Sequence, residues 1–412
     1  MPPVRVTSEI GPLEAVLVHT PGRELLAVTP GTREEYLYDD IIDLEEARAE
    51  HQGMVAVLRH FATVYEVRDL LEDLVDEDTV RSRLTGGMLE VVGADGLASD
   101  LAELPAREFA SLIIEGVLEE VGPLARALNE PAYVLPAMPN LFFTRDIGIV
   151  IGSHVLIGAM RYEARWSEEL VIRTLFAHHP VLENAGMLYD GSIERRPDLT
   201  IEGGDVHPLR EDLLVLGCSS RTSAAGIDAL CELLFAQGTI TDVLIVVMPG
   251  QPTAIHLDML FTQVDRGLCV VSPSHFIGPE RLPVLHRRRG EMTLRETSDF
   301  FTALRSVDFP MEPVLCGGDL RPQQEREQWA SGCNMLTLRP GVALAYRRND
   351  ETLAECERAG FTIVEGEHLG TGGDGIDPGV LDRAVITFRG SELVRGGGGP
   401  RCMTLPLRRG EA

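Results

Sequence analysis

The side chains in this sequence that can do chemistry are a thiol, an imidazole and several carboxylates. The thiol belongs to Cys402, which follows a glycine run at 396–399 and the pair Pro400-Arg401. Four successive glycines let a backbone come close to a ligand, because no Cβ atom blocks positive φ angles or a close approach. A surface turn beside an incidental buried thiol explains this stretch equally well. Other motifs must therefore decide whether Cys402 is presented or merely packed.

The imidazole belongs to His256, two positions before Asp258. Both residues fall on an expected strand at 256–261, so their side chains should project from the same face. A histidine can shuttle a proton near neutral pH, and a carboxylate can hold a cation. Two other interpretations stay open: a satisfied pair in the core, and a non-haem iron site completed by a distant histidine such as His368. The iron site would leave Cys402 and the acidic motifs unused.

The remaining carboxylates lie in two motifs at the starts of apolar runs, Glu202-Gly203-Gly204-Asp205 and Asn140-x-x-Phe143-Thr144-Arg145-Asp146. Paired glycines allow a tight backbone and the approach of a small ligand. Each motif is weak by itself, because solvated acids at a glycine turn and a local Arg145–Asp146 ion pair are both common.

Taken together, these groups favour a cationic substrate. Carboxylates near a thiol raise its pKa and make it a poor nucleophile. A guanidinium group would pair with Asp146 and Asp258 through its planar fork of donors, and its charge would favour the thiolate on arrival. Its central carbon is an electrophile that needs a soft nucleophile nearby and an acid for the departing ammonia.

Composition narrows the class of protein. The 412 residues include 37 basic residues, all of them arginine, so lysine Schiff-base chemistry, a lysine general base and a Walker-type phosphate lysine are excluded. A formal net charge of −27 argues against nucleic acid or an anionic membrane as partner and would attract a cationic substrate. The seven cysteines form no C-x-x-C pair, and neither a signal peptide nor a membrane span is evident. We expect a cytoplasmic protein with reduced thiols.

A ββαβ pattern that recurs along the chain must position these groups. The five copies open with expected strands at 14–19, 141–146, 201–205, 256–261 and 334–338. Expected helices lie at 45–61, 167–178, 224–237 and 350–359. If the copies pack around a common axis, their strand starts converge at one end and build one site from distant residues. A Rossmann-like sheet explains the repeated elements nearly as well.

One segment does not fit the repeat. Residues 69–128 contain 14 acidic residues and 4 arginines, with apolar positions at helical spacing. We expect an inserted helical subdomain with a solvated acidic face. The predicted organisation is a propeller in two parts, 1–68 and 129–412, interrupted by this insert.

Across nearly its whole length the chain resembles the arginine deiminase family of guanidino-modifying enzymes. The motifs that carry the resemblance, in order, are at 8–11, 140–146, 202–205, 256–258, 326–329 and 398–403. The resemblance implies an α/β fold, a five-bladed α/β propeller with a helical insert. It also implies hydrolysis of L-arginine to L-citrulline and ammonia, with no organic cofactor and no metal.

The resemblance also implies a role for each matching position. Cys402 would attack the guanidinium carbon, and His256 would protonate the departing ammonia and then activate water. Asp146 and Asp258 would clamp the guanidinium nitrogens, with Glu202 supporting the histidine. The remaining matches are Arg165 and Arg221 for the α-carboxylate, and Asn140 and Phe143 for the pocket wall.

The chain departs from the family pattern in two places. The family usually has an arginine five residues before the cysteine, where this chain has Gly397, with Arg395 two residues earlier. The segment 361–383 looks longer than usual and is glycine-rich, as expected of a mobile loop near the site. Other guanidines as substrates, amidino transfer to an amine, and a catalytically impaired arginine-binding relative remain alternatives. We also expect a homo-oligomer.

Overall fold

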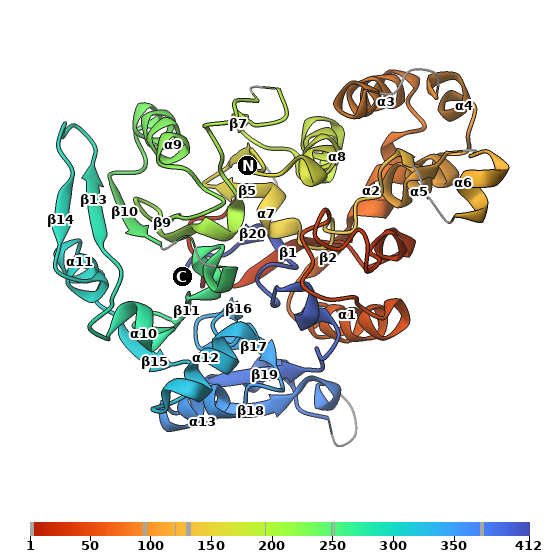
Figure 1. The fold of residues 1–412 in the computed structure, drawn as a ribbon. Helices are drawn as coiled ribbons and strands as arrows, with labels where there is room; N and C mark the ends of the chain where they lie inside the picture. The colour runs from red at the N-terminus through yellow and green to blue at the C-terminus, as the bar shows by residue number, and fades with distance from the viewer. Residues whose placement is uncertain are drawn as a thin grey trace.

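A unit of two antiparallel strands, a helix and a third strand parallel to the second accounts for most of the chain (Figure 1). The computed structural model describes residues 4–93, 97–119, 121–128, 133–193, 195–248, 250, 252–370 and 375–412. Within these residues, five of the six sheets contain three or more strands, and each of these five holds one copy of the unit. The protein is therefore a mixed α/β fold built from repeats.

The strands of each sheet pair in the following order. The first sheet contains β2 (Thr63–Glu66), β1 (Leu13–Val18) and β20 (Leu405–Arg409), and the second contains β5 (Gly148–Ile151), β6 (His154–Ile157) and β7 (Met187–Asp190). The third contains β14 (Arg295–Thr297), β13 (Val284–Arg288), β10 (Asp242–Val247), β9 (Leu213–Cys218) and β8 (Val206–Arg210). The fourth contains β11 (Phe261–Asp265), β12 (Leu268–Val271) and β15 (Glu312–Leu315). The fifth contains β16 (Leu336–Arg339), β17 (Val342–Tyr346), β19 (Ala384–Phe388) and β18 (Thr362–Glu365), and a small sixth pairs β3 (Val117–Leu118) with β4 (Tyr133–Leu135).

The first sheet joins the two ends of the chain. Strand β1 runs parallel to β2, with Ala15 opposite Thr63, and antiparallel to β20, with Leu17 opposite Leu405. The segment that carries Cys402 is therefore held against the N-terminal part of the chain. Among the described residues no strand joins two of the five larger sheets, so strand pairing alone does not close a ring.

The helices of the described residues alternate with these strands along the chain, and most of them bury one or more side chains. They are α1 (Leu44–Leu58), α2 (Val67–Leu74), α3 (Asp78–Val92), α4 (Ala98–Ala102), α5 (Ala106–Glu115), α6 (Pro123–Ala127), α7 (Thr144–Ile147), α8 (Trp166–His178), α9 (Ala224–Gln237), α10 (Pro273–Phe276), α11 (Phe300–Ser306), α12 (Arg321–Trp329) and α13 (Asp350–Arg358). Helix α9 shows why such helices form where they do. The Ser223 side chain accepts a hydrogen bond from the amide of Gly226 at its start, and Gly238, with φ of 91°, ends it.

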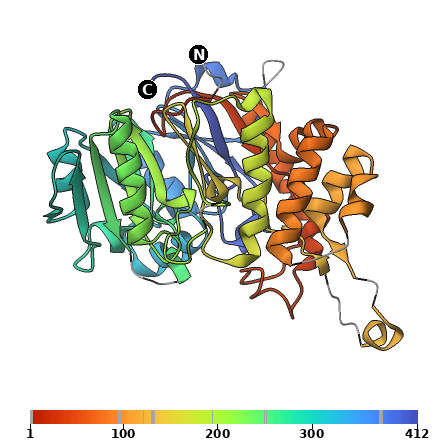
Figure 2. The same cartoon turned by 90° about the horizontal axis from the view of Figure 1, so that it is seen from above.

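Helices α2 to α6 occupy the part of the chain where an acidic insert was expected. They lie to one side of the sheets, with α3 against α8 (Figures 1 and 2). The apolar faces of α2 to α5, including Leu84, Met88 and Phe109, share one core with Val171 and Leu175 of α8. Helix α6 has no buried side chain. The acidic residues thus accompany helices of which four bury an apolar face.

Most predicted elements agree with the structure, but three predicted strand starts are wrong. Residues 141–146 form a turn and the short helix α7, and 203–205 and 257–259 form single 3₁₀ turns. The apolar side chains in these stretches had suggested strands, yet the true strands start at Gly148, Val206 and Phe261. The polar side chains of the candidate site therefore lie on turns, whose backbone is not held by sheet pairing.

The glycine-rich segment 361–383 lies partly outside the described residues, since 371–374 are not described. Its described residues include β18, at the edge of the fifth sheet, and two 3₁₀ turns. None of these described residues lines the two cavities at the candidate site.

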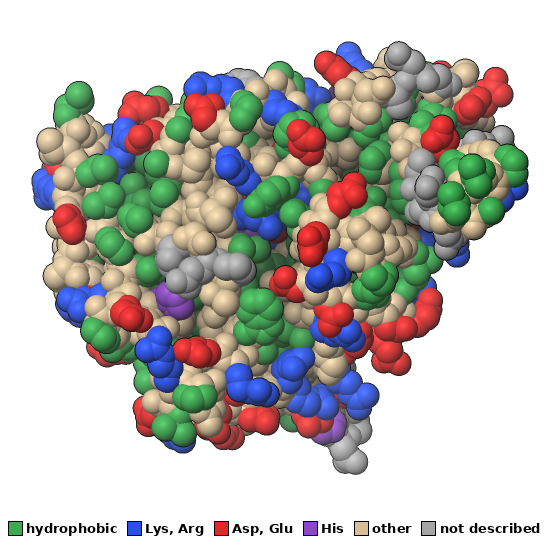
Figure 3. All heavy atoms as spheres, in the orientation of Figure 1, with side chains coloured by type: hydrophobic (Ala, Val, Ile, Leu, Met, Phe, Trp, Pro, Cys, Tyr) green, Lys and Arg blue, Asp and Glu red, His purple; other side chains and the backbone are tan. Residues whose placement is uncertain are grey.

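The surface carries acidic and basic side chains intermixed over the face shown in Figure 3. No helix among the described residues has the length and apolar character needed to cross a bilayer.

Candidate active site

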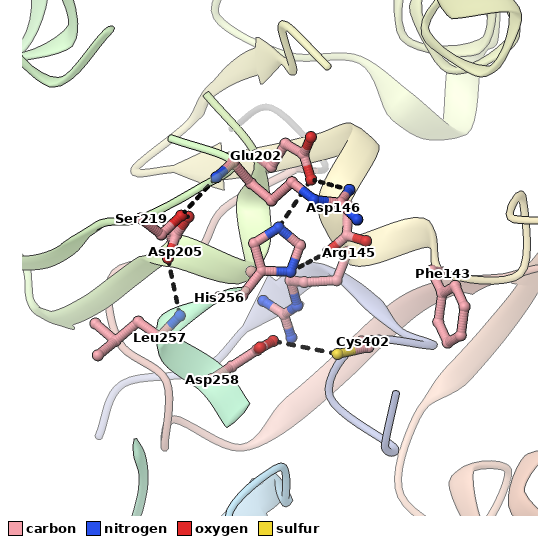
Figure 4. A network of polar contacts seen from close by, with 12 residues as sticks. Phe143, Arg145, Asp146, Glu202, Asp205, Ser219, His256, Leu257, Asp258 and Cys402 are labelled. Carbon is pink, nitrogen blue, oxygen red and sulfur yellow. Dashed lines mark hydrogen bonds and ion pairs between the residues drawn. The ribbon is translucent and has the colours of Figure 1, made fainter. Parts of the chain in front are cut away.

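Five turns, each directly before the first strand of one repeat, supply the site. They carry Asp146, Glu202, His256 with Asp258, Asn334 and Cys402, and they precede β5, β8, β11, β16 and β20. Close contacts between side chains of different turns show that these residues meet. Figure 4 shows the His256 imidazole among Asp146, Glu202, Asp258 and Cys402. The predicted convergence is thus observed, although it comes from turns and not from strand ends.

Cys402 is buried, at 4% relative exposure, and its sulfur lies against an amide and a carboxylate. Sγ lies 3.0 Å from Nδ2 of Asn334 and 3.4 Å from Oδ2 of Asp258. Burial, together with the charges of Asp258 and Asp146, raises the pKa of the Cys402 thiol well above its usual value. The resting sulfur is therefore a protonated thiol beside a carboxylate.

The glycines before Cys402 are required by space and by backbone angle. A Cβ on Gly398 would lie 2.4 Å from the Phe143 ring, and one on Gly399 would lie 2.7 Å from the side-chain oxygen of Asn334. Gly397 adopts a φ of +88°, which favours glycine. The hydroxyl of Tyr346 donates to the carbonyl of Gly398 at 2.9 Å and fixes the run.

His256 is held by carboxylates on both ring nitrogens. Nε2 lies 2.8 Å from Oε2 of Glu202, and Nδ1 lies 3.6 Å from Oδ1 of Asp146. Although burial opposes it, the charge of Asp146 and the hydrogen bond to Glu202 raise the pKa of His256 to about 9. The imidazole is therefore an imidazolium at neutral pH and can act as a proton donor.

The Gly-Gly motif provides room for this ring. A Cβ on Gly204 would lie 2.6 Å from Cγ of His256. Asp205, from the same motif, accepts two hydrogen bonds. Its Oδ1 accepts one from the amide of Leu257 at 2.8 Å, and its Oδ2 accepts one from Ser219 at 2.6 Å. The bond to Leu257 fixes the turn between His256 and Asp258, which are not on one strand face as predicted.

Both predicted guanidinium-binding aspartates keep a buried oxygen without a hydrogen-bond partner among the described residues. These atoms are Oδ1 of Asp146 and Oδ1 of Asp258. The second oxygen of each carboxylate is bound to an arginine, Oδ2 of Asp146 to Arg165 at 2.7 Å and Oδ2 of Asp258 to Arg401 at 2.9 Å. Because an orphaned buried carboxylate oxygen is costly, the pair points to a ligand with hydrogen-bond donors.

The two arginines predicted to bind the α-carboxylate of the substrate, Arg165 and Arg221, differ in how many partners their guanidinium groups have. Arg165 is 3% exposed, and its nitrogens are engaged by Asp146, by Glu168 and by the backbone carbonyls of Asn140 and Phe143. Within the described part of the chain, the Arg221 side chain makes one ion pair, at 3.3 Å to Glu202, and its guanidinium lies 4.8 Å from the ring centre of Tyr162.

Two connected cavities reach these groups from the surface. An inner cavity of about 40 Å³ is lined by residues that include Asn140, Phe143, Asp146, His256 and Cys402. An outer cavity of about 660 Å³ shares Leu37, Arg221, Ile255, Met259, Gly396 and Gly397 with the inner one. Asn140 and Phe143 thus line the inner cavity, which is small and shares part of its wall with the wider outer cavity.

The positions of the carboxylates and histidines bear on the alternative of a non-haem iron site. Asp146, Glu202 and His256 are a group of described residues whose ligand atoms lie within 4.8 Å of one another. Two arginines, Arg165 and Arg221, already pair with the two carboxylates, so the charge that would attract a metal ion is compensated. His368, proposed in the iron alternative, is exposed and does not belong to this group.

Sequence reasoning assigned no role to two further residues of the site. Arg401 is fully buried and connects Asp258 to Glu9, its Nη2 lying 3.1 Å from Oε1 of Glu9. Asn334 contacts Cys402 directly. The available signals were the position of Asn334 at the start of the fifth repeat and the adjacency of Arg401 to the cysteine. Neither indicates a contact on its own.

Comparisons with known proteins agree with this geometry. The family model "Arginine deiminase" matches residues 118–409. The arginine deiminase of Streptococcus gordonii is 32% identical over 437 residues, covering 99% of each chain. Among solved structures, the product-bound N-terminal domain of ArgZ, an arginine dihydrolase from cyanobacteria, has a TM-score of 0.53 at 13% identity, covering 96% of this chain and 98% of that one. A mutant of DDAH from Pseudomonas aeruginosa, complexed with citrulline, has a TM-score of 0.51 at 12% identity, covering 95% and 98%. At such low identities the two structures support the fold alone.

Proposed function

The chain belongs to the arginine deiminase family, and we propose that it hydrolyses L-arginine to L-citrulline and ammonia through a covalent intermediate on Cys402. The observation that carries the proposal is the pair of buried oxygens, Oδ1 of Asp146 and Oδ1 of Asp258, that accept no hydrogen bond from the described residues and flank the imidazole and the thiol. A planar guanidinium supplies the donors that both oxygens lack. Its carbon would then lie between the sulfur and the proton donor.

Binding of the substrate activates the thiol. The charges of Asp258 and Asp146 oppose the thiolate in the resting enzyme. A bound guanidinium offsets those charges, so the thiol releases its proton to water and the sulfur becomes nucleophilic. The enzyme is therefore reactive chiefly when its substrate is present.

The first half of the reaction forms a bond from Sγ of Cys402 to the guanidinium carbon. The His256 imidazolium gives a proton to one terminal nitrogen, the carbon–nitrogen bond breaks, and ammonia leaves. A positively charged S-alkylthiouronium remains on Cys402. His256 is then neutral, with Glu202 holding Nε2.

The second half hydrolyses this intermediate. Neutral His256 removes a proton from water, and the oxygen attacks the same carbon. Collapse breaks the carbon–sulfur bond and regenerates the thiolate, while the hydroxyl proton is lost to water and leaves the ureido group of citrulline. His256 thus acts as acid first and base second.

We assign the α-carboxylate of the substrate to Arg221, which lines both cavities and, among the described residues, has a single ion-pair partner. The engaged nitrogens of Arg165 support a different role, the positioning of Asp146. A carboxylate-binding arginine favours L-arginine over agmatine, which has no carboxylate.

The wider organisation is also part of the proposal. The five repeats and the convergence of their turns support a five-bladed propeller, with residues 1–68 and 129–412 as its parts and 69–128 as a helical insert. We further propose a cytoplasmic homo-oligomer that requires no cofactor.

Mass spectrometry of protein quenched during turnover tests the function. We expect citrulline and ammonia as products and, on the Cys402 peptide, an adduct with the mass of arginine less ammonia. An amidinotransferase would leave only an amidino group on the cysteine, and turnover of agmatine as efficient as that of arginine would contradict the role of Arg221. The Cys402→Ser variant should bind arginine without forming either adduct. Full activity of that variant would overturn the mechanism.

A further inference from the structure

The amide of Asn334 encloses the nucleophile from two sides. Its Oδ1 accepts hydrogen bonds from the backbone amides of Arg401 at 3.1 Å and of Cys402 at 3.2 Å. Its Nδ2 lies 3.0 Å from Sγ of Cys402 and donates to the carbonyl of Asp258 at 3.2 Å. Asn334 is completely buried, so no water competes for these bonds.

The orientation of this amide follows from its surroundings. Backbone N–H groups can only donate, so the atom facing residues 401 and 402 must be the oxygen. The atom facing Sγ and the Asp258 carbonyl must then be the NH₂ group. A flipped amide would set two N–H groups against an NH₂ group and a carbonyl against an oxygen. Sγ therefore faces a hydrogen-bond donor.

We propose that Asn334 is a catalytic residue whose amide donates a hydrogen bond to Sγ of Cys402 and stabilises the sulfur anion before attack and after release of the product. This inference rests on the proposed function, because it assigns a role to a residue at the same sulfur. A neutral donor suits this place, since a cation would compete with the guanidinium for Asp258 and a carboxylate would repel the thiolate. Hydrogen bonds to an ionised partner are about twice as strong as neutral ones.

Some groups around the sulfur disfavour the negative charge of the Cys402 thiolate, and others favour it. Asp258 and Asp146 oppose the thiolate, whereas a hydrogen bond from the backbone of Gly399 and the charge of Arg401 favour it. His256 lines the same inner cavity as Cys402. Within this set of described residues, Asn334 is the side-chain donor at hydrogen-bond distance from Sγ.

Glycine at position 399 fits this role. A Cβ there would lie 2.7 Å from Oδ1 and 2.9 Å from Cβ of Asn334. The glycine run thus lets the amide reach the sulfur as well as letting the backbone approach the ligand.

The substitution Asn334→Asp separates the donor from the anchor. A carboxylate can still accept the amide hydrogen bonds of residues 401 and 402, so the turn keeps its partners, but at pH 8 an ionised carboxylate cannot donate to sulfur. We expect kcat to fall about 10- to 100-fold with a small change in KM, since a hydrogen bond to a charged group is lost and a negative charge takes its place beside the sulfur. Asn334→Ala should give a loss of similar direction together with lower stability.

A second readout does not require turnover. The rate at which iodoacetamide alkylates Cys402 in the absence of arginine, followed across pH on the Cys402 peptide, reports the thiolate fraction. We expect the alkylation profiles of Asn334→Asp and Asn334→Ala to shift to higher pH, and the rate at pH 8 to fall about 10-fold. Asn349→Ala is the matched control, because Asn349 is also buried but donates to the carbonyl of Ala330.

An alkylation profile and a kcat that both match the wild type in Asn334→Asp would overturn the proposal. Lower stability with an unshifted alkylation profile in Asn334→Ala would also overturn it, since that result describes a structural anchor only. Failure of the proposed function has a different signature, which is full turnover in Cys402→Ser whatever residue stands at position 334.

Discussion

Sγ of Cys402 lies 3.4 Å from Oδ2 of Asp258, and the same oxygen accepts a hydrogen bond from Arg401 at 2.9 Å. The nucleophile thus rests against a carboxylate that also belongs to a buried chain of charges ending at Glu9. This contact suppresses the thiolate while the site is empty and becomes favourable once a cation is shared between them. The contact with Asp258 therefore keeps the thiol protonated in the empty site and also favours its reaction with a bound guanidinium.

Asp258→Asn should separate these two effects. Removal of the charge should lower the pKa of Cys402, so alkylation of the resting thiol becomes faster. The guanidinium loses one buried charged partner, so kcat/KM for arginine should fall about 100-fold or more. Peptide-resolved alkylation and steady-state kinetics measure the two effects. Asp242→Asn, which changes a buried aspartate paired with His286, is the control and should alter neither. Slower alkylation in Asp258→Asn would contradict the assigned role.

The pKa of His256 predicts how activity and stability depend on pH. It is raised from 6.5 to about 9 in the folded state, so the folded protein holds this proton more tightly than the unfolded chain. The resulting stability is fully present below pH 6.5 and is lost as pH rises through 9. It amounts to at most about 3 kcal/mol, since each pKa unit corresponds to about 1.36 kcal/mol. The free energies of unfolding of the wild type and of His256→Asn, measured with denaturant, should approach each other as pH rises from about 6.5 to 10.

The alkaline limb of kcat should follow the same proton. Glu202→Gln removes a charge that raises the pKa of His256, so this limb should move to lower pH by about one unit. Glu169→Gln changes another buried carboxylate that binds Arg195 and the amide of Met160, and it should leave the limb in place. An unmoved limb in Glu202→Gln would mean that another group limits the rate at high pH.

The repeats could be predicted from the sequence because apolar runs and turn residues are local signals. Helix α9 begins and ends where the pattern places it, after a Ser223 cap and before Gly238. Its position depends on periodicity and capping, which neighbouring residues supply.

The turns that carry the site could not be predicted in this way. The spacing of His256 and Asp258 is compatible with a strand, and the 3₁₀ turn between them is fixed by Asp205, which is distant in the sequence. The contact of Asn334 with Cys402 likewise joins residues 68 positions apart. Such contacts are set by tertiary packing, so a sequence indicates the side-chain types and only the fold indicates their partners.

The two predicted carboxylate-binding arginines should behave differently when they are replaced. Arg221→Ala should raise KM for arginine about 100-fold, because it removes a charged partner at the cavity wall, and should leave the weak turnover that we expect with agmatine unchanged. Arg165→Gln should instead lower the free energy of unfolding by about 3–5 kcal/mol, since Asp146 and Glu168 lose a buried counterion. Kinetics with both substrates and denaturant unfolding distinguish the two outcomes. A selective KM effect in Arg165→Gln would reverse the assignment.

Two glycine substitutions should show that glycine serves different purposes within this site. At Gly204 a Cβ would lie 2.6 Å from the His256 ring, so Gly204→Ala should displace the imidazole from Glu202 and lower kcat at least about 10-fold. At Gly397 the space is open, but φ is +88°, so Gly397→Ala should cost about 1–2 kcal/mol of stability through backbone strain. Because the strain does not reach the imidazole, kcat in Gly397→Ala should change little at a temperature where the variant is folded. Steady-state kinetics and denaturant unfolding should be measured on both variants, so that kcat and the free energy of unfolding can be compared between them. A loss of kcat in Gly397→Ala equal to that in Gly204→Ala would show that the glycine turn itself moves during turnover, as its place in the walls of both cavities would allow.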